Sequence, residues 1–233
     1  MISLDEVHVW SASLDVPDDT IRTAWAILSP DEVARAEQLR KESDRNRFVV
    51  ARGILRKILS VILEVPPSIV RFETTTHGKP VLAAEHSGAG IEFNLSHSHD
   101  LALYVVTKSR RVGIDLEYIR EIDAVNVAEH FFSVAEYENL RRLPADQQRA
   151  AFFTCWTRKE AYIKARGEGL TRPLQSFEVS IFPEKPQLLW CEDDPAELDR
   201  WFFANVSPFA EYAATLAVEG HGWALSTWHW QHS

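Results

Sequence analysis

VGIDLEY, residues 112–118, alternates apolar and acidic side chains in the manner of a β-strand. Positions 112, 114, 116 and 118 are apolar, and Asp115 and Glu117 stand between them. Because successive side chains of a strand point to opposite faces, both carboxylates leave the same face. Two like charges roughly 5–7 Å apart repel each other unless a cation lies between them. A lone Asp-x-Glu pair is more often a solvated strand face, so the pair alone only suggests a cation site.

A second stretch, CWTRKEAYIK at residues 155–164, has the spacing of a helix. Glu160 and Lys164 are four residues apart and would share one helix face, with Trp156 one turn earlier. An ordinary helical ion pair worth about 0.3–0.5 kcal/mol is the alternative interpretation. Together with Asp115 and Glu117, however, Glu160 completes a set of three hard oxygen donors, which suits Mg²⁺ better than zinc. Because Mg²⁺ in proteins usually takes water and phosphate oxygens as its remaining ligands, this set predicts a phosphate-bearing ligand.

The order of the predicted elements repeats along the chain. The helix-start motif Ser-x-x-Glu occurs at residues 29–32 and again at 133–136. An aromatic-led helix follows each motif, 19 residues after Ser29 at Phe48 and 20 residues after Ser133 at Phe153. Strand-like segments then follow each pair of helices. We therefore predict two similar α/β subdomains, residues 1–110 and 111–233, with a ligand site in the cleft between them. Coincidence is the alternative, because helix pairs before strands are common.

The composition is typical of a soluble globular protein and excludes several functions. The chain has 233 residues, of which 45% are hydrophobic and 25% charged. Its net charge of −9 argues against nucleic-acid binding, and no apolar run is long enough to span a membrane. The N-terminus lacks the pattern of a signal peptide, and two cysteines without metal-like spacing favour the reducing cytoplasm.

Three segments have side chains that could bind an anionic ligand. Residues 35–57 carry eight basic and three acidic side chains, which fits either a solvated helix face or a small, highly anionic ligand. THGKPVL, residues 76–82, places Lys79 and Pro80 on a turn, where the alternative is an exposed lysine on a loop. In FNLSHSHD, residues 93–100, Ser96 and His97 would either bind phosphate or cap a turn between two strands.

Together these motifs resemble the 4′-phosphopantetheinyl transferases. VGIDLE followed by WTRKEAYIK looks like the paired signature of the surfactin-synthetase-type (Sfp-like) branch, and GKP and FNLSHS match its two upstream motifs in the right order. FFSVAEYENL and GEGL fit its intervening segments. The likeness covers nearly the whole chain and is closest to the cyanobacterial heterocyst-glycolipid-type members. It implies an α/β (α+β) monomer of two halves related by a pseudo-two-fold, with coenzyme A in the cleft.

The resemblance also implies which residues bind which ligand. Asp115, Glu117 and Glu160 would bind Mg²⁺, with Mn²⁺ as the alternative ion. A larger group would line the coenzyme A site: Ser96 and His97 at the phosphates, Lys79, Arg47 and Arg52 at the nucleotide end, and also Pro80 and Lys159. Glu32 falls where some members carry a lysine, so the contacts of the basic helix would differ in this chain.

The implied reaction moves the 4′-phosphopantetheine group of coenzyme A to a serine hydroxyl of an apo acyl, polyketide or peptidyl carrier protein, and releases adenosine 3′,5′-bisphosphate. Glu160, directly or through a water, would accept the serine proton. Lys164 would stabilise the departing bisphosphate.

Two other classes of protein use the same side chains. One is a Mg²⁺-dependent hydrolase or nuclease acting on phosphates, and the other is a protein that binds coenzyme A or carriers without turnover. Carrier domains are typically acidic, as this chain is, so docking would need local basic or apolar residues. Phe131, Phe132 and Tyr137 are candidates for such a patch, with core packing as the alternative.

Overall fold

The computed structural model describes residues 2–182 and 186–232, and the same series of elements occurs twice in it. The first series is β1 (Glu6–Ser13), α1 (Asp18–Trp25), α2 (Pro30–Glu37), α3 (Glu42–Leu63), β2 (Phe72–Thr74), β3 (Pro80–Leu82), β4 (Ile91–Ser98) and β5 (Leu101–Lys108). The second is β6 (Val112–Tyr118), α4 (Ala124–Phe131), α5 (Val134–Arg141), α6 (Ala145–Arg166), β7 (Phe177–Val179), β8 (Leu188–Cys191), β9 (Trp201–Asn205) and β10 (Tyr212–Glu219). The short helix α7 (Glu197–Arg200) precedes β9, and β11 (Ala224–His229) follows β10.

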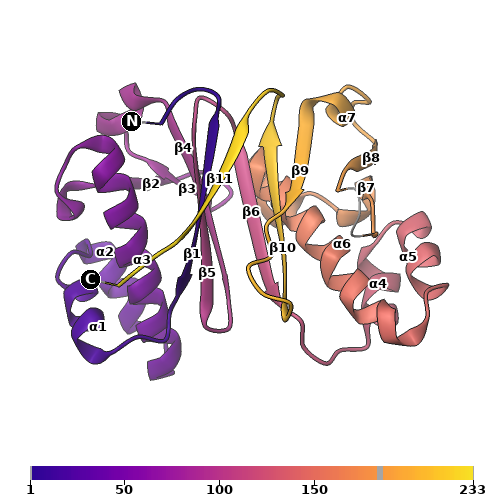
Figure 1. The fold of residues 1–233 in the computed structure, drawn as a ribbon, viewed down its shortest axis with the longest axis horizontal. Helices are drawn as coiled ribbons and strands as arrows, with labels where there is room; N and C mark the ends of the chain where they lie inside the picture. The colour runs from indigo at the N-terminus through magenta and orange to yellow at the C-terminus, as the bar shows by residue number, and fades with distance from the viewer. Residues whose placement is uncertain (1, 183–185, 233) are drawn as a thin grey trace.

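Two sheets with matching strand order form the centre of the molecule (Figure 1). In the first half the order is β1-β5-β4, and in the second it is β6-β10-β9, so each strand has its counterpart at the same place. The exception is β11, which runs parallel to β1 at the edge of the first sheet although it lies within the range predicted for the second half. This architecture confirms the predicted α/β fold of two similar halves. Their boundary at residues 110/111 stays a proposal.

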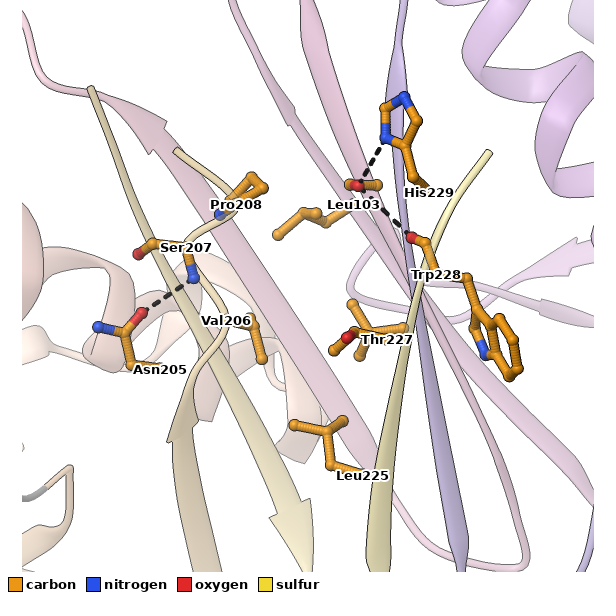
Figure 2. A pocket seen from close by; sticks show the side chains of 11 residues that line it. Leu103, Asn205, Val206, Ser207, Pro208, Leu225, Thr227, Trp228 and His229 are labelled. Atoms are coloured by element: carbon orange, nitrogen blue, oxygen red, sulfur yellow. Dashed lines mark hydrogen bonds between the residues drawn. The ribbon is translucent and has the colours of Figure 1, made fainter. Parts of the chain in front are cut away.

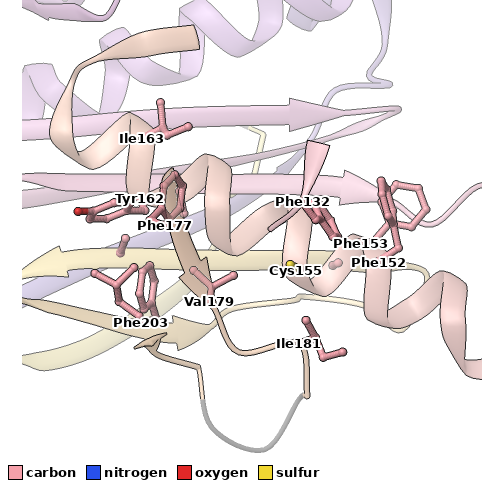
Figure 3. Packing of buried hydrophobic residues seen from close by; sticks show 14 of the residues in the cluster. Phe132, Phe152, Phe153, Cys155, Tyr162, Ile163, Phe177, Val179, Ile181 and Phe203 are labelled. Carbon is pink, nitrogen blue, oxygen red and sulfur yellow. The ribbon is translucent and has the colours of Figure 1, made fainter. Parts of the chain in front are cut away.

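The halves pack as four layers, with helices on the two outer sides and the sheets face to face between them (Figure 1). Helix α3 covers the outer face of the first sheet, where Leu55, Leu59 and Tyr104 are fully buried. Helix α6 covers the outer face of the second sheet with an aromatic cluster that includes Tyr162 and Phe177 (Figure 3). The two inner faces share a third apolar cluster of valine, leucine and isoleucine side chains. Burial of this shared cluster from water fixes the two halves against each other. Within the two described ranges, no helix combines the length and the apolar character that a bilayer span requires.

Both predicted Ser-x-x-Glu capping boxes are present, and each glutamate has a second role. Glu32 and Glu136 are buried, and each forms an ion pair with a basic side chain of the long helix in its own half. Arg56 Nε lies 2.7 Å from Glu32 Oε2, and Lys159 Nζ lies 2.8 Å from Glu136 Oε2. Because the two pairs occupy equivalent places, the internal repeat extends to individual side chains.

Helix α6 lies unusually close to strand β6, and Gly113 is the reason. A Cβ at this position would stand 2.1 Å from the carbonyl oxygen of Ala161 and 2.3 Å from the amide nitrogen of Ala165. The absence of a side chain therefore lets the helix backbone pack directly on the strand that carries Asp115. The helix ends at Gly167, whose φ of 75° is readily accessible to glycine.

Candidate active site

A side-chain ladder joins the two halves where strand β4 meets the edge of strand β6. Asn94 Oδ1, Ser96 Oγ and Ser98 Oγ accept hydrogen bonds from the backbone N–H groups of residues 114, 116 and 118, at 2.9, 3.3 and 3.0 Å. Strand β6 is an edge strand of its own sheet, so these N–H groups would otherwise be left unpaired inside the molecule. The ladder therefore fixes β4 and β6 in one register.

Asp115 lies at the centre of this seam and is only 4% exposed. Its Oδ1 accepts hydrogen bonds from Ser96 Oγ at 3.0 Å and from Lys164 Nζ at 2.6 Å. Lys164 Nζ also donates to Ser96 Oγ, at 3.0 Å. The other oxygen, Oδ2, is buried without a hydrogen-bond partner in the part of the chain that the structure describes. An unpartnered buried carboxylate oxygen is costly unless a cation or a donor binds it.

The other two predicted carboxylates, Glu117 on β6 and Glu160 on α6, each interact electrostatically with Asp115. Glu117 Oε2 accepts from Ser98 Oγ at 3.0 Å and lies 3.4 Å from Arg120 Nη1. Burial raises the pKa of Glu117, and the charge of Asp115 raises it further. Burial also raises the pKa of Glu160 to about 7, with a second contribution from Asp115 and a smaller one from Glu117. Besides burial, the negative charge of Asp115 thus disfavours ionisation of both glutamates.

The donor set fits a hard divalent cation, although the side chains as placed do not form a coordination shell. Among the described residues, no group of three or more His, Cys, Asp or Glu side chains is arranged to hold a metal ion. At Asp115 Oδ1 the ammonium of Lys164 takes the position of a counter-charge. Asp115 Oδ2 lacks a hydrogen-bond partner among the described residues, and the charge of Asp115 helps to raise the pKa of Glu117 and of Glu160, so a cation beside these carboxylates would be favourable. Carboxylate oxygens are the ligands that Mg²⁺ and Mn²⁺ prefer.

A cavity of about 250 Å³ is lined by residues of helix α6 and of the THGKP loop, and of the three predicted carboxylates it is Glu160 that lines it. Lys79, Pro80, Glu160 and Lys164 all line it. Burial lowers the pKa of Lys79, whose Nζ donates to the Val112 carbonyl at 3.1 Å. Two lysines and a carboxylate therefore share one cavity, an arrangement that suits an anionic ligand with a cation at one end.

The other residues predicted for coenzyme A lie at varying distances from this cavity. Ser96 is in the seam itself. Burial lowers the pKa of His97, and the positive charges of Lys164, Arg47 and Arg52 lower it further. All three cations are therefore close enough to His97 to affect its charge. Arg47, however, forms a two-bond ion pair with Asp15, at 2.8 and 3.0 Å.

Arg52 and Lys159 are held within their own halves. The Arg52 side chain is 14% exposed and lies 3.7 Å from Glu32. This positive charge helps to accommodate a glutamate at position 32, where some family members carry a lysine. Lys159 is fully buried, and besides its ion pair with Glu136 its Nζ donates to the carbonyls of Leu174 and Phe177. Neither residue lines the described cavity. Lys159 therefore stabilises the second half in this structure, away from the carboxylates.

Three residues that matter for the geometry are absent from the sequence predictions. Gly113, Asn94 and Ser98 bring β4, β6 and α6 together, and the polar alternation N-x-S-x-S within FNLSHS was the available signal for the last two. Phe132 is 2% exposed and stacks on Phe152, so it belongs to the core (Figure 3), whereas Phe131 is 48% exposed.

Comparison with known proteins places the chain in a family. Residues 10–109 match the N-terminal model of a 4′-phosphopantetheinyl transferase, and residues 111–217 match the model of the 4′-phosphopantetheinyl transferase superfamily. The chain belongs to this superfamily. Each match falls within one structural half, and together they contain every residue of the β4–β6–α6 site.

Individual relatives extend the match along the chain. It is 42% identical to the 4′-phosphopantetheinyl transferase HetI of Nostoc sp. over 227 residues, covering 97% of this chain and 93% of that protein. It is 37% identical to the transferase psf-1 of Bacillus pumilus over 72% of this chain and 70% of that one. With the transferase Sfp of Bacillus subtilis it shares 30% identity over 67% of each chain. The predicted resemblance to the Sfp-like branch is thereby confirmed.

Proposed function

We propose that this chain transfers the 4′-phosphopantetheine group of coenzyme A to a serine hydroxyl of an apo carrier protein and releases adenosine 3′,5′-bisphosphate. The observation that supports it most directly is the cavity lined by Lys79, Glu160 and Lys164, where Lys164 Nζ also lies 2.6 Å from Asp115 Oδ1. A cation site next to lysines is the chemistry that a diphosphate requires.

Asp115, Glu117 and Glu160 would hold Mg²⁺ or Mn²⁺. When bound, this ion supplies positive charge to the diphosphate oxygens and lowers the energy of charge that develops there. The residues of the chain prepare its place: Ser96 donates to Asp115, and Ser98 donates to Glu117.

The remaining steps belong to protein side chains. Glu160 would accept the proton of the attacking serine, directly or through a water. Lys164 would move its ammonium from Asp115 to the departing bisphosphate and offset the charge that collects there. Lys79 and His97 would hold other phosphate oxygens of coenzyme A, and Ser96 would donate to them if it is released from Asp115.

We further propose that the protein acts as a monomer in the reducing cytoplasm. The internal repeat supplies both sides of the site from one chain, so no second copy is needed to complete it. Cys155 and Cys191 are both buried and unpaired, in keeping with a reducing compartment. Of the predicted docking patch, Tyr137 is partly buried against the core, and the exposed ring of Phe131, in contact with Trp156, is the better placed for an apolar contact with the carrier.

Mass spectrometry of an apo carrier incubated with the protein, coenzyme A and Mg²⁺ tests the proposal. The carrier should gain the mass of one phosphopantetheine group, and the gain should disappear with EDTA. A panel of acyl, polyketide and peptidyl carriers that all remain unmodified would refute it. Incubation with coenzyme A alone separates the alternative of a phosphate hydrolase, because only a hydrolase would release a bisphosphate without an acceptor.

A further inference from the structure

The two ladder serines repeat one pattern of hydrogen bonds. Ser96 accepts from the N–H of residue 116 and donates to the carboxylate of Asp115. Ser98 accepts from the N–H of residue 118 and donates to the carboxylate of Glu117. A serine hydroxyl has a single proton. The N–H of the strand occupies a lone pair on each oxygen, and the proton of each hydroxyl is directed to the carboxylate one residue earlier.

We propose that Ser98 is a positioning residue that holds the Glu117 carboxylate in the orientation needed for the divalent cation. This inference rests on the proposed function, because it concerns the same cation site. Among the described residues, the Glu117 carboxylate contacts one other hydrogen-bonding side chain, that of Arg120, which is 59% exposed and lies 3.4 Å away. The Ser98 bond is shorter and comes from a strand that is itself fixed by β5, so it defines the direction of the carboxylate. Such supporting bonds to metal ligands typically change metal affinity 10- to 100-fold when they are removed.

The equivalent place on the other side of the molecule, between β9 and β1, has no such ladder among the described residues, so the ladder is not a general requirement for joining the two halves. By the repeat, β9 and β1 correspond to β4 and β6, but β11 lies beside β1 and satisfies its edge with backbone hydrogen bonds. Between β11 and residues 205–208 lies a groove of about 390 Å³ (Figure 2). Its lining contains no carboxylate among the described residues, and no serine pair that bridges a strand edge to an acid. The pattern of serine, strand N–H and carboxylate thus occurs at the seam with the cation site.

The test compares Ser98→Ala with Ser98→Thr, which keeps the hydroxyl, in the full-length protein. Mn²⁺ binding is followed by the electron paramagnetic resonance signal of the free ion, with coenzyme A present. Ser98→Ala should weaken Mn²⁺ binding about 10-fold or more, and Ser98→Thr should restore most of it. In transfer assays the Mn²⁺ concentration for half-maximal rate should rise by the same factor, while kcat at saturating Mn²⁺ changes less than about twofold.

Matched variants exclude a general effect of losing a hydroxyl. Ser87 is exposed, and among the described residues its hydroxyl bonds to the Ala84 carbonyl of its own turn alone, so Ser87→Ala should bind Mn²⁺ like the wild type. In a Glu117→Gln background, Ser98→Ala should cause no further loss of affinity, because its target carboxylate is gone. If Ser98→Ala does not fold, Ser98→Cys, which has a weaker donor of similar size, should give an intermediate affinity.

The proposed function and the positioning role of Ser98 would be refuted by different results. Wild-type protein that neither binds Mn²⁺ with coenzyme A nor modifies a carrier would overturn the proposed function. Wild-type protein that does both, together with a Ser98→Ala variant of unchanged Mn²⁺ affinity, would overturn only the role of Ser98. A variant that loses kcat at unchanged Mn²⁺ affinity, or a loss that Ser98→Thr does not repair, would also overturn it.

Discussion

Gly113 offers a direct test of whether the close packing of helix α6 on strand β6 builds the site. An added Cβ would lie 2.1 Å from the Ala161 carbonyl oxygen, whereas ordinary contact begins at 3.4 Å. The clash is with backbone atoms, so no side-chain rotation relieves it, and helix and strand must separate by about 1.3 Å. If the whole helix shifts outward, the 2.6 Å contact between Lys164 Nζ and Asp115 Oδ1 opens to about 3.9 Å, beyond hydrogen-bond range.

We expect Gly113→Ala to lower carrier modification about 100-fold, because a displacement of about 1 Å in a catalytic group has an effect of this order. Overpacking should also lower the free energy of unfolding by about 1–3 kcal/mol. Far-ultraviolet circular dichroism and urea unfolding would show that the variant still folds, and mass spectrometry of a carrier would give the rate.

Gly88 provides the control, because an added Cβ there meets nothing within 4 Å. Gly88→Ala should therefore keep both the rate and the unfolding midpoint of the wild type. Wild-type activity in a folded Gly113→Ala protein would refute the reasoning, since it would mean that the separation of α6 from β6 does not set the geometry of the site.

Three further predictions use the same site and its surroundings. Glu160→Gln should leave the fold intact and reduce carrier modification about 10²- to 10⁴-fold, and a near-normal rate would remove Glu160 from proton transfer. Lys164→Met should bind Mn²⁺ about five- to tenfold more tightly in the absence of coenzyme A, because its ammonium no longer competes for Asp115, and yet lose turnover; weaker Mn²⁺ binding would contradict this. Arg111 lowers the pKa of Glu219 to about 2 by hydrogen bonding, so this carboxylate stabilises the folded state above its ordinary pKa and the stabilisation is lost as the pH falls from about 4.5 towards 2. Over that pH window the free energy of unfolding of Glu219→Gln should fall by about 1–2 kcal/mol less than that of the wild type. If the urea midpoints of the two proteins depend on pH in the same way, the Arg111–Glu219 ion pair does not stabilise the fold.

The local placement of the acidic side chains and of Lys164 could be predicted from the sequence, because both patterns depend on short spacings. Alternation in VGIDLEY places Asp115 and Glu117 on one strand face, and four-residue spacing places Glu160 and Lys164 on one helix face. The repeated capping boxes likewise rest on contacts within four residues, and both formed as expected. Patterns of this kind are decided by the backbone period, which the sequence carries directly.

The predictions that placed basic residues at the ligand depended on partners that are distant in sequence. Lys159 lies within the motif WTRKEAYIK, next to Glu160, which lines the cavity. On a helix, however, adjacent side chains point about 100° apart, so Lys159 faces another direction. What decides the role of Lys159 is Glu136, a capping-box residue 23 positions earlier, and local spacing gives no sign of that pairing. The same holds for Arg47 and Asp15, which are 32 residues apart.

The internal repeat would supply two equivalent seams, and individual side chains explain why only one is suited to catalysis. Helices α3 and α6 both have 22 residues, and the position that Glu160 occupies in α6 is taken by Lys57 in α3. The position of Lys164 corresponds to Val61, which is 78% exposed and cannot bind phosphate. The second seam therefore has no counterpart of Glu160 or Lys164, and strand β11 pairs with the edge of β1 there. Duplication would thus supply the scaffold twice, while the acid, the lysine and the serine ladder make one seam chemically distinct.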